Sequence, residues 1–221
     1  MERNHPEDGD RAALVAAGAI VELHDQAVAA WHGAGCGTDA ALAAAGSDAW
    51  LAAVARQHRS NFELWHIEDE ARTPGAADAV IADVKRRIDL TNQRRNDLAE
   101  ELDRLLIEHL AARSLPRPEA PLHSESPGLM IDRLSILALK IYHTREQAER
   151  PGAPAGHAQR NRQRLAILLE QRADLAGCLD ELWRATLAGE RRFKLYRQLK
   201  MYNDPALNPS IYGAETAAGS R

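Results

Sequence analysis

The feature that most restricts the fold of this chain is a long helical hairpin that occurs twice. Shifting the sequence against itself by 77 residues aligns residues 56–105 with residues 133–182 without a gap, and 14 of the 50 aligned pairs are identical. Identical pairs that a composition rich in Ala and Leu does not explain are His66 with His143, Arg95 with Arg172, and the breaker Pro74-Gly75 with Pro151-Gly152. We interpret the pattern as an internal duplication.

Apolar spacing and helix breakers predict the elements. We expect helices at residues 11–31, 48–72, 77–113, 128–150 and 156–187, a short helix at 39–45, and a basic aromatic helix at 191–202. A linker with four prolines, residues 114–127, separates hairpin repeats at about 48–113 and 128–187. Two such hairpins most simply form a four-helix-bundle-like core with extra N- and C-terminal helices. The expected protein is therefore all-α, with a single domain at residues 11–213 between flexible tails at 1–10 and 214–221.

Charge and cysteine content narrow the class of protein. The formal net charge is −4, with no run of Lys or Arg suited to nucleic acid. Only two cysteines are present, too few for a disulfide framework. No apolar run approaches the ~20 residues of a membrane span, and the first residues do not form a signal peptide. We expect a cytoplasmic protein that binds neither nucleic acid nor membrane.

Residues 129–143 are apolar almost all the way round the predicted helix, which is typical of a helix buried on most sides. Asp132, Lys140 and His143 share one stripe of it, and Arg133 lies to one side. Isolated charges there would cost several kcal/mol, so they must be paired or hydrated. Two interpretations stay open: a salt-bridge network that sets helix register, and a polar cavity that holds a ligand.

Two matched arginines also fall on apolar faces, Arg95 and Arg172. Counting turns places Arg172 level with Asp132, close enough for a pair between guanidinium and carboxylate. The residue that matches Asp132 in the first hairpin is Ala55. Arg95 therefore lacks the corresponding local partner, and we expect it to be available for an anionic ligand.

Further candidates come from the first hairpin and from the C-terminal region. On helical phase Asp69 is the inward-facing acid of its helix. The stripe Lys85, Asp89 and Asn92 is solvated unless the C-terminal helix covers it. The basic residues Lys194, Arg197 and Lys200 either close over an anion as a lid or lie on a solvated helix.

The histidines that match between the repeats each precede an acid by three residues, as His66-x-x-Asp69 and His143-x-x-Glu146. Such a pair suits two ligands for one metal, an oriented general base, or a surface ion pair. Glu63-x-x-His66 also fits half of a di-iron motif, but Lys140 in the matching place spoils the other half. We therefore predict no metal ligands and no cofactor, and keep a metal-dependent enzyme as an alternative.

Four blocks of the sequence, in order, carry a family resemblance: residues 61–69, 85–97, 127–137 and 200–205. With them the chain resembles, over about residues 49–212, a bacterial family catalogued as domain of unknown function 4254. The resemblance implies a companion of glycosyltransferase and surface-polysaccharide genes and favours a functional role for the first-hairpin stripe and the last turn. Residues 86–92 are also similar, more weakly, to the opening helix of chorismate mutases, which stabilise a dianionic rearrangement with buried cations.

We expect a small-molecule enzyme that acts on an anionic metabolite by electrostatic and acid/base catalysis, in polysaccharide or secondary-metabolite biosynthesis. The alternative from another class is a helical adaptor that binds a partner protein, and a homodimer or a partner enzyme suits either hypothesis. The predicted catalytic residues are His66, Asp69, Asp132 and His143. The predicted substrate-binding residues are Lys85, Asp89, Asn92, Arg95, Arg133, Lys140, Arg172, Lys194, Arg197 and Lys200.

Overall fold

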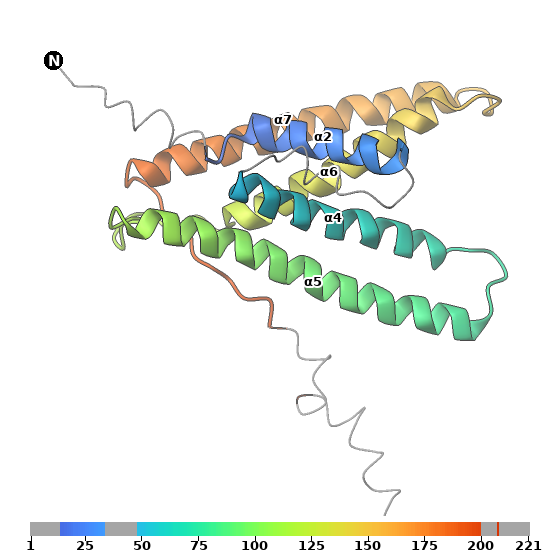
Figure 1. Cartoon of the computed structure of the whole chain (residues 1–221). Coiled ribbons are helices and arrows are strands. Elements are labelled where there is room, and N and C mark those ends of the chain that lie inside the picture. Colours follow the sequence, from blue (N-terminus) through green and yellow to red (C-terminus); the bar gives the residue numbers. More distant parts are fainter. Residues whose placement is uncertain (1–13, 34–47, 200–206, 208–221) are drawn as a thin grey trace, which may run out of the picture.

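The computed structural model describes residues 14–33, 48–199 and 207, and this part of the chain is all-α. Its helices are α2 (Ala17–Gly33), α4 (Ala49–Glu70), α5 (Asp78–Ala111), α6 (Pro127–Glu149) and α7 (His157–Leu187). Figure 1 shows the α4–α5 and α6–α7 hairpins, each with antiparallel helices. The expected fold class is confirmed, and the four long helices begin and end within a few residues of their predicted bounds. The expected helix at 39–45 and both tails lie outside the described residues.

Local signals account for the helix ends. The Asp48 carboxylate accepts hydrogen bonds from the backbone N–H groups of Trp50 and Leu51, at 2.8 and 3.2 Å, and so caps the start of α4. The turn to α5 contains Gly75 at φ +76°, a conformation that favours glycine. Pro127 opens α6, where its missing N–H costs nothing. These signals are all within a few residues of the ends they explain.

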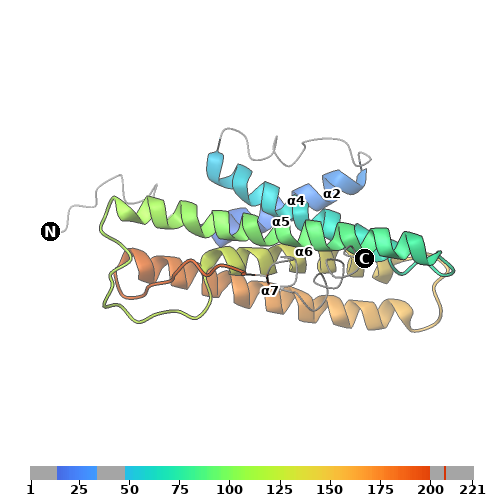
Figure 2. The same cartoon turned by 90° about the horizontal axis from the view of Figure 1, so that it is seen from below.

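Helix α6 is the centre of the bundle. It contacts α2, α4, α5 and α7, and α2 in turn lies against α4, α6 and α7. In the view of Figure 2, α6 runs between the α4–α5 hairpin and α7. The core side chains are fully buried, among them Leu102, Leu106, Ile131, Leu134 and Leu179. This packing is bundle-like, as expected, while the origin of the two hairpins by duplication stays a prediction.

A close approach joins α5 to the start of α6. A Cβ on Gly128 would overlap the Ala99 carbonyl oxygen, so only glycine fits there. The Asp103 carboxylate, from α5, accepts a bond from the Gly128 N–H at 2.7 Å and one from the Ser126 hydroxyl. Burial raises the pKa of Asp103 to about 6, although these two hydrogen bonds oppose the shift.

The predicted basic helix at residues 191–202 is wrong where the structure describes it, because residues 191–199 form no helix and Arg192 makes an isolated β-bridge with Leu122. The backbone of Arg192 bonds instead to the proline-rich linker, accepting from the His123 N–H at 2.8 Å and donating to the Pro121 carbonyl at 3.1 Å. The Phe193 side chain is buried in the core and anchors this segment. Hydrogen bonds to the linker and the burial of Phe193 therefore hold this segment in place of the helix that its apolar spacing predicted.

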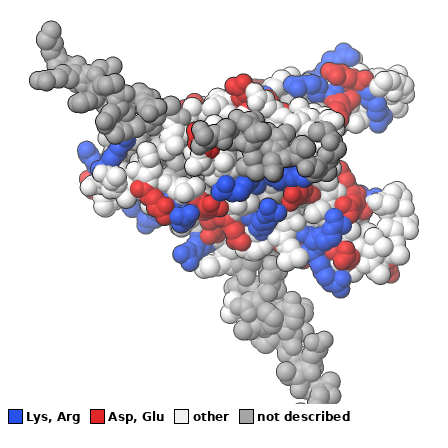
Figure 3. Space-filling view, viewed as in Figure 1, with Lys and Arg blue, Asp and Glu red and all other residues white. Residues whose placement is uncertain are grey.

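No helix in the described part of the chain is both long and apolar enough to cross a membrane. On the face seen in Figure 3, Lys and Arg side chains are interspersed with Asp and Glu. Several form ion pairs, such as Arg87 with Glu70 and Arg72 with Glu68. Exposed pairs of this kind contribute little to stability, about 0–1 kcal/mol each.

Candidate three-histidine site

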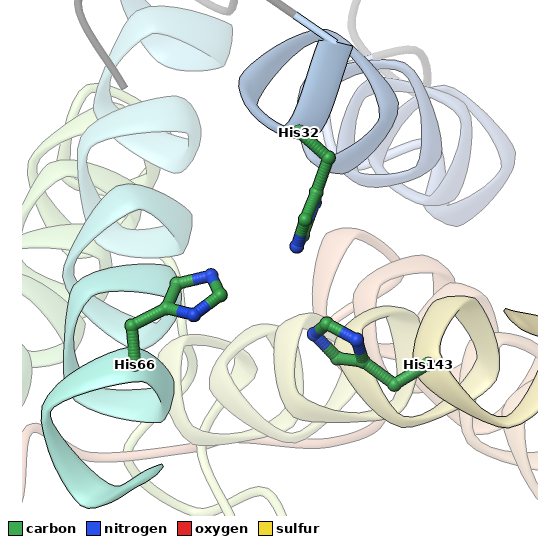
Figure 4. A group of neighbouring side chains, drawn as sticks. All are labelled: His32, His66 and His143. Carbon is green, nitrogen blue, oxygen red and sulfur yellow. The ribbon is translucent and has the colours of Figure 1, made fainter. Parts of the chain in front are cut away.

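Three histidines from three helices converge between α2, α4 and α6. His32 lies in the last turn of α2, His66 near the end of α4, and His143 in the second half of α6. One nitrogen from each ring lies within 4.8 Å of the corresponding nitrogen of the others. Figure 4 shows the three rings directed toward a common space. They are the one group of three or more metal-ligand side chains so arranged in the residues that the structure describes.

Two of the rings are held in a definite orientation by their Nδ1 atoms. The Nδ1 of His32 is 2.9 Å from the Val28 carbonyl oxygen, and the Nδ1 of His143 is 2.8 Å from a Glu146 carboxylate oxygen. Because both partners accept, Nδ1 carries the proton and Nε2 keeps a lone pair. Both Nε2 atoms are buried and have no hydrogen-bond partner among the described residues. A buried polar atom left in this way costs about 1–3 kcal/mol.

Aromatic side chains frame the three rings. Tyr142 stacks on His32, with ring centroids 4.4 Å apart and planes 20° apart. Trp65 stacks on His143 at 5.0 Å and 12°. The edge of Phe62 meets His66 at 4.5 Å. These contacts restrict the side-chain torsions of the histidines, so their convergence is built into the packing.

The environment of His66 favours its neutral form. Burial lowers the pKa of His66, and positive charge on His32 and His143 would lower it further. A neutral imidazole is the form that binds a metal ion. The lowered pKa of His66 therefore favours its metal-binding form near neutral pH.

The sequence pattern points to two of these histidines and misses the third. His66 and His143 are predicted from the matched repeats, and the structure brings them together with ring centroids 6.0 Å apart. His32 precedes a glycine-rich breaker, and nothing in its local sequence indicates that α2 crosses the ends of α4 and α6. The acid after His143, Glu146, is a hydrogen-bond partner of the ring. The acid after His66, Asp69 in the last turn of α4, is predicted to face inward but is exposed, and its Oδ1 lies 3.6 Å from Nη1 of Arg72 in the turn after this helix.

The buried carboxylate of Asp132 is hydrogen-bonded by side chains of the protein itself. Its Oδ1 accepts from Gln57 at 2.6 Å, from Asn61 at 2.9 Å and from the Arg95 Nε at 2.8 Å, and its Oδ2 accepts from a second Arg95 nitrogen. The Asp132 hydrogen bond raises the pKa of Arg95. Arg95 has no carboxylate partner within the described residues of its own hairpin, as expected, but the expectation that it is available for an anionic ligand is wrong, because Asp132 of the other hairpin pairs with it. The salt-bridge network therefore describes Asp132 and Arg95, whereas Lys140 and His143 line a cavity.

The expected pair between Arg172 and Asp132 is also wrong. Arg172 is inward-facing, as predicted, but its Nη1 donates to both carboxylate oxygens of Asp25 on α2, at 2.6 and 2.9 Å. Helix α2 packs against α7 on this side, so the carboxylate beside the Arg172 guanidinium is that of Asp25 and not that of Asp132. Lys140 and Arg133 are exposed rather than inward, and Arg133 pairs with Glu125 at 2.8 Å.

The other predicted binding residues do not join the histidines. Lys85 and Asp89 form an exposed pair one turn apart, and Asn92 accepts a long bond from Arg95, 3.4 Å. Lys194 and Arg197 are exposed in the non-helical segment after α7. Lys200 lies outside the described residues.

Fold and site together define an all-α protein with a three-histidine group between the helices of its bundle. The chain belongs to the family described as protein of unknown function (DUF4254), whose pattern matches residues 51–195. This confirms the resemblance seen in the sequence. His66 and His143 lie within the matched region and His32 lies before it. No curated protein and no solved structure matches the chain.

Proposed function

We propose that this protein is a metal-dependent enzyme whose divalent ion is held by His32, His66 and His143. The observation that carries the proposal is the pair of buried Nε2 atoms, on His32 and His143, that face a third imidazole without hydrogen-bond partners in the described structure. A metal ion satisfies all three nitrogens at once. The proposal differs from the expected absence of metal ligands, and it makes His66 and His143 ligands in place of the acid/base residues expected from the sequence.

The donor set suits zinc. Three imidazole nitrogens with no thiolate are typical of catalytic zinc sites, which keep a fourth position for water or substrate. Tetrahedral coordination with Zn–N bonds of about 2.0–2.1 Å places the nitrogens about 3.3 Å apart. In the structure these nitrogens lie within 4.8 Å of one another, and a bound ion would draw them closer together.

Metal-binding histidines commonly donate their second ring N–H to a neighbouring acceptor, and such acceptors are present here. A carboxylate on the far nitrogen of a ligating histidine fixes its tautomer and increases its basicity, and Glu146 stands in this relation to His143. The Val28 carbonyl does the same for His32. Trp65 and Tyr142 hold the ring planes.

An ion with an open position lowers the pKa of bound water to about 7 and so supplies a nucleophile at neutral pH. Hydrolysis or hydration of a small molecule is therefore the class of reaction that we assign. A buried charged site at Asp132 and Arg95 has less support, because these two charges neutralise each other. The alternative of a helical adaptor also has less support, because binding a partner protein does not require three converging histidines.

Metal analysis tests the proposal directly. Protein purified without chelator and loaded with Zn²⁺ should hold one equivalent after dialysis, and Co²⁺ in its place should give the visible absorption of a tetrahedral site. His32→Ala, His66→Ala and His143→Ala should each lose the metal while the helical circular dichroism is kept. His157→Gln, at a histidine outside the group, is the matched control. Less than stoichiometric metal, or retention of metal in all three variants, would overturn the proposal.

A further inference from the structure

A cavity of about 460 Å³ lies on the α7 side of the three-histidine group. Its lining includes one side chain of that group together with polar, apolar and cationic residues from α4, α6 and α7: His143, Trp65, Lys140, Asn161, Arg164 and Ile167. The volume is in the range of cavities that hold small organic ligands. His143 therefore belongs to both features, since its ring lines the cavity and its Nε2 belongs to the three-histidine group.

The charge of this cavity has one sign. Lys140 and Arg164 line it, and none of its lining residues is a carboxylate. Neither cation forms an ion pair within the described residues, and the one contact of the Arg164 guanidinium is a long bond of 3.5 Å to the Asn161 amide oxygen. Most other arginines that line cavities or the core are neutralised, as Arg133 is by Glu125 and Arg172 by Asp25.

The remaining walls are apolar. Trp65, Ile167 and Leu168 line the cavity, and Ile167 is 54% exposed although it is a large aliphatic side chain. The indole of Trp65 stacks on His143, so this wall adjoins the histidine group. An apolar body can pack there while an anionic group lies between the two cations, where a planar guanidinium and an ammonium both donate hydrogen bonds.

We propose that this cavity is the substrate pocket and that it selects small organic anions, in which a carboxylate or phosphate group is joined to an apolar portion. The inference rests on the proposed metal site for its chemistry but not for its binding energy. Lys140 and Arg164 bind the anionic group. Trp65 and Ile167 bind the apolar part, and His143 forms the wall next to the reacting centre.

Tryptophan fluorescence gives a local readout. Of the four tryptophans, Trp31, Trp50 and Trp183 are at most 6% exposed, so a ligand in the cavity reports through Trp65. Phenylphosphonate and benzoate should quench the emission in a saturable manner, and benzyl alcohol, which is neutral, should not. The two anions separate a preference for phosphate from one for carboxylate.

Charge variants and metal content complete the test. Lys140→Gln and Arg164→Gln should each weaken anion binding by about fivefold or more, since each change removes a positive charge and its hydrogen-bond donors from the anion. Arg162→Gln, an exposed arginine two residues away on α7, should leave it unchanged. Binding that is absent, or equal in all three variants, would overturn the inference. Repeating the titration after chelation separates the proposals: anion binding without zinc binding removes the metal site alone, and zinc binding without anion binding removes the pocket alone.

Discussion

The guanidinium of Arg95 and the carboxylate of Asp132 face each other as a two-pronged pair, although they belong to different hairpins. The Asp132 side chain is 8% exposed and that of Arg95 is 23% exposed. Gln57 and Asn61 donate to the same carboxylate, so the pair ties α4, α5 and α6 together.

Breaking this pair should destabilise the fold. Arg95→Met leaves a buried carboxylate without its cation, and we expect the free energy of unfolding to fall by about 3–5 kcal/mol in urea denaturation. Adding Asp132→Asn should recover part of the loss. Arg94→Met removes an exposed pair with Glu63 and should change stability by less than about 1 kcal/mol. Equal effects of the two arginine changes would show that burial of the pair is unimportant.

The carboxylate behind His143 should tune metal affinity. Glu146→Gln keeps the shape but weakens the acceptor on Nδ1, and loss of such a partner typically reduces metal affinity by about 10–100-fold. Competition with a chromophoric chelator measures the change. Glu149→Gln, an exposed acid at the end of the same helix, should have no effect. An unchanged affinity for Glu146→Gln would remove the glutamate from the metal site.

Acid should weaken the fold of the metal-free protein through two buried histidines. Burial lowers the pKa of His58 to about 3 and lowers that of His24 well below its usual value. Below pH 6.5 the unfolded chain therefore binds more protons than the folded chain, down to about pH 3 for His58. As the pH falls, the free energy of unfolding decreases by roughly 1.4 kcal/mol per pH unit for each histidine that stays neutral in the fold. Asp103 acts in the opposite direction, because its raised pKa of about 6 adds stability as pH falls toward 3.8. The destabilisation from the two histidines exceeds the stabilisation from Asp103, so the net free energy of unfolding falls as the pH is lowered.

Urea titrations from pH 7 to pH 4 measure this slope. Neither ring nitrogen of His24 has a hydrogen-bond partner in the described part of the chain. His24→Leu should therefore be tolerated at pH 7 and should flatten the slope by about one histidine's share. An identical slope in wild type and His24→Leu would mean that His24 does not titrate on unfolding.

Two glycines in helices should respond oppositely to alanine. Gly128→Ala places a methyl group against the Ala99 carbonyl and should destabilise the protein by about 2 kcal/mol or more. Gly177, in α7, has no neighbouring side chain within 4 Å of the place that a methyl group would take, and Gly177→Ala should stabilise by up to about 1 kcal/mol. Thermal denaturation of the two variants checks the sign of each change. A stabilised Gly128→Ala variant would mean that α5 and α6 do not need this close approach.

Much of the fold is predictable because helix ends depend on nearby residues. The cap at Asp48, the Pro-Gly breakers and the proline that opens α6 each act within a turn, and the apolar pattern of residues 129–143 indicates the central place of α6. The prediction for the C-terminal segment is wrong because its conformation depends on Phe193 and on hydrogen bonds to a distant linker.

The sequence by itself determined the bounds of the four long helices and the inner-face placement of Arg95, Asp132 and Arg172, because both follow from local propensity and helical phase. The same phase argument placed Asp69 and Lys140 inward, and the structure leaves them exposed. Tertiary structure decided the partners. Phase places Arg95 and Arg172 on inner faces, but their acids come from residues 37 and 147 positions away. The match between the repeats points to His66 and His143, but only the packing of α2 against α4 and α6 brings His32 to them. Side-chain periodicity specifies a direction from the helix axis, whereas a site requires the distance and identity of the neighbour in that direction, which depend on how whole helices pack.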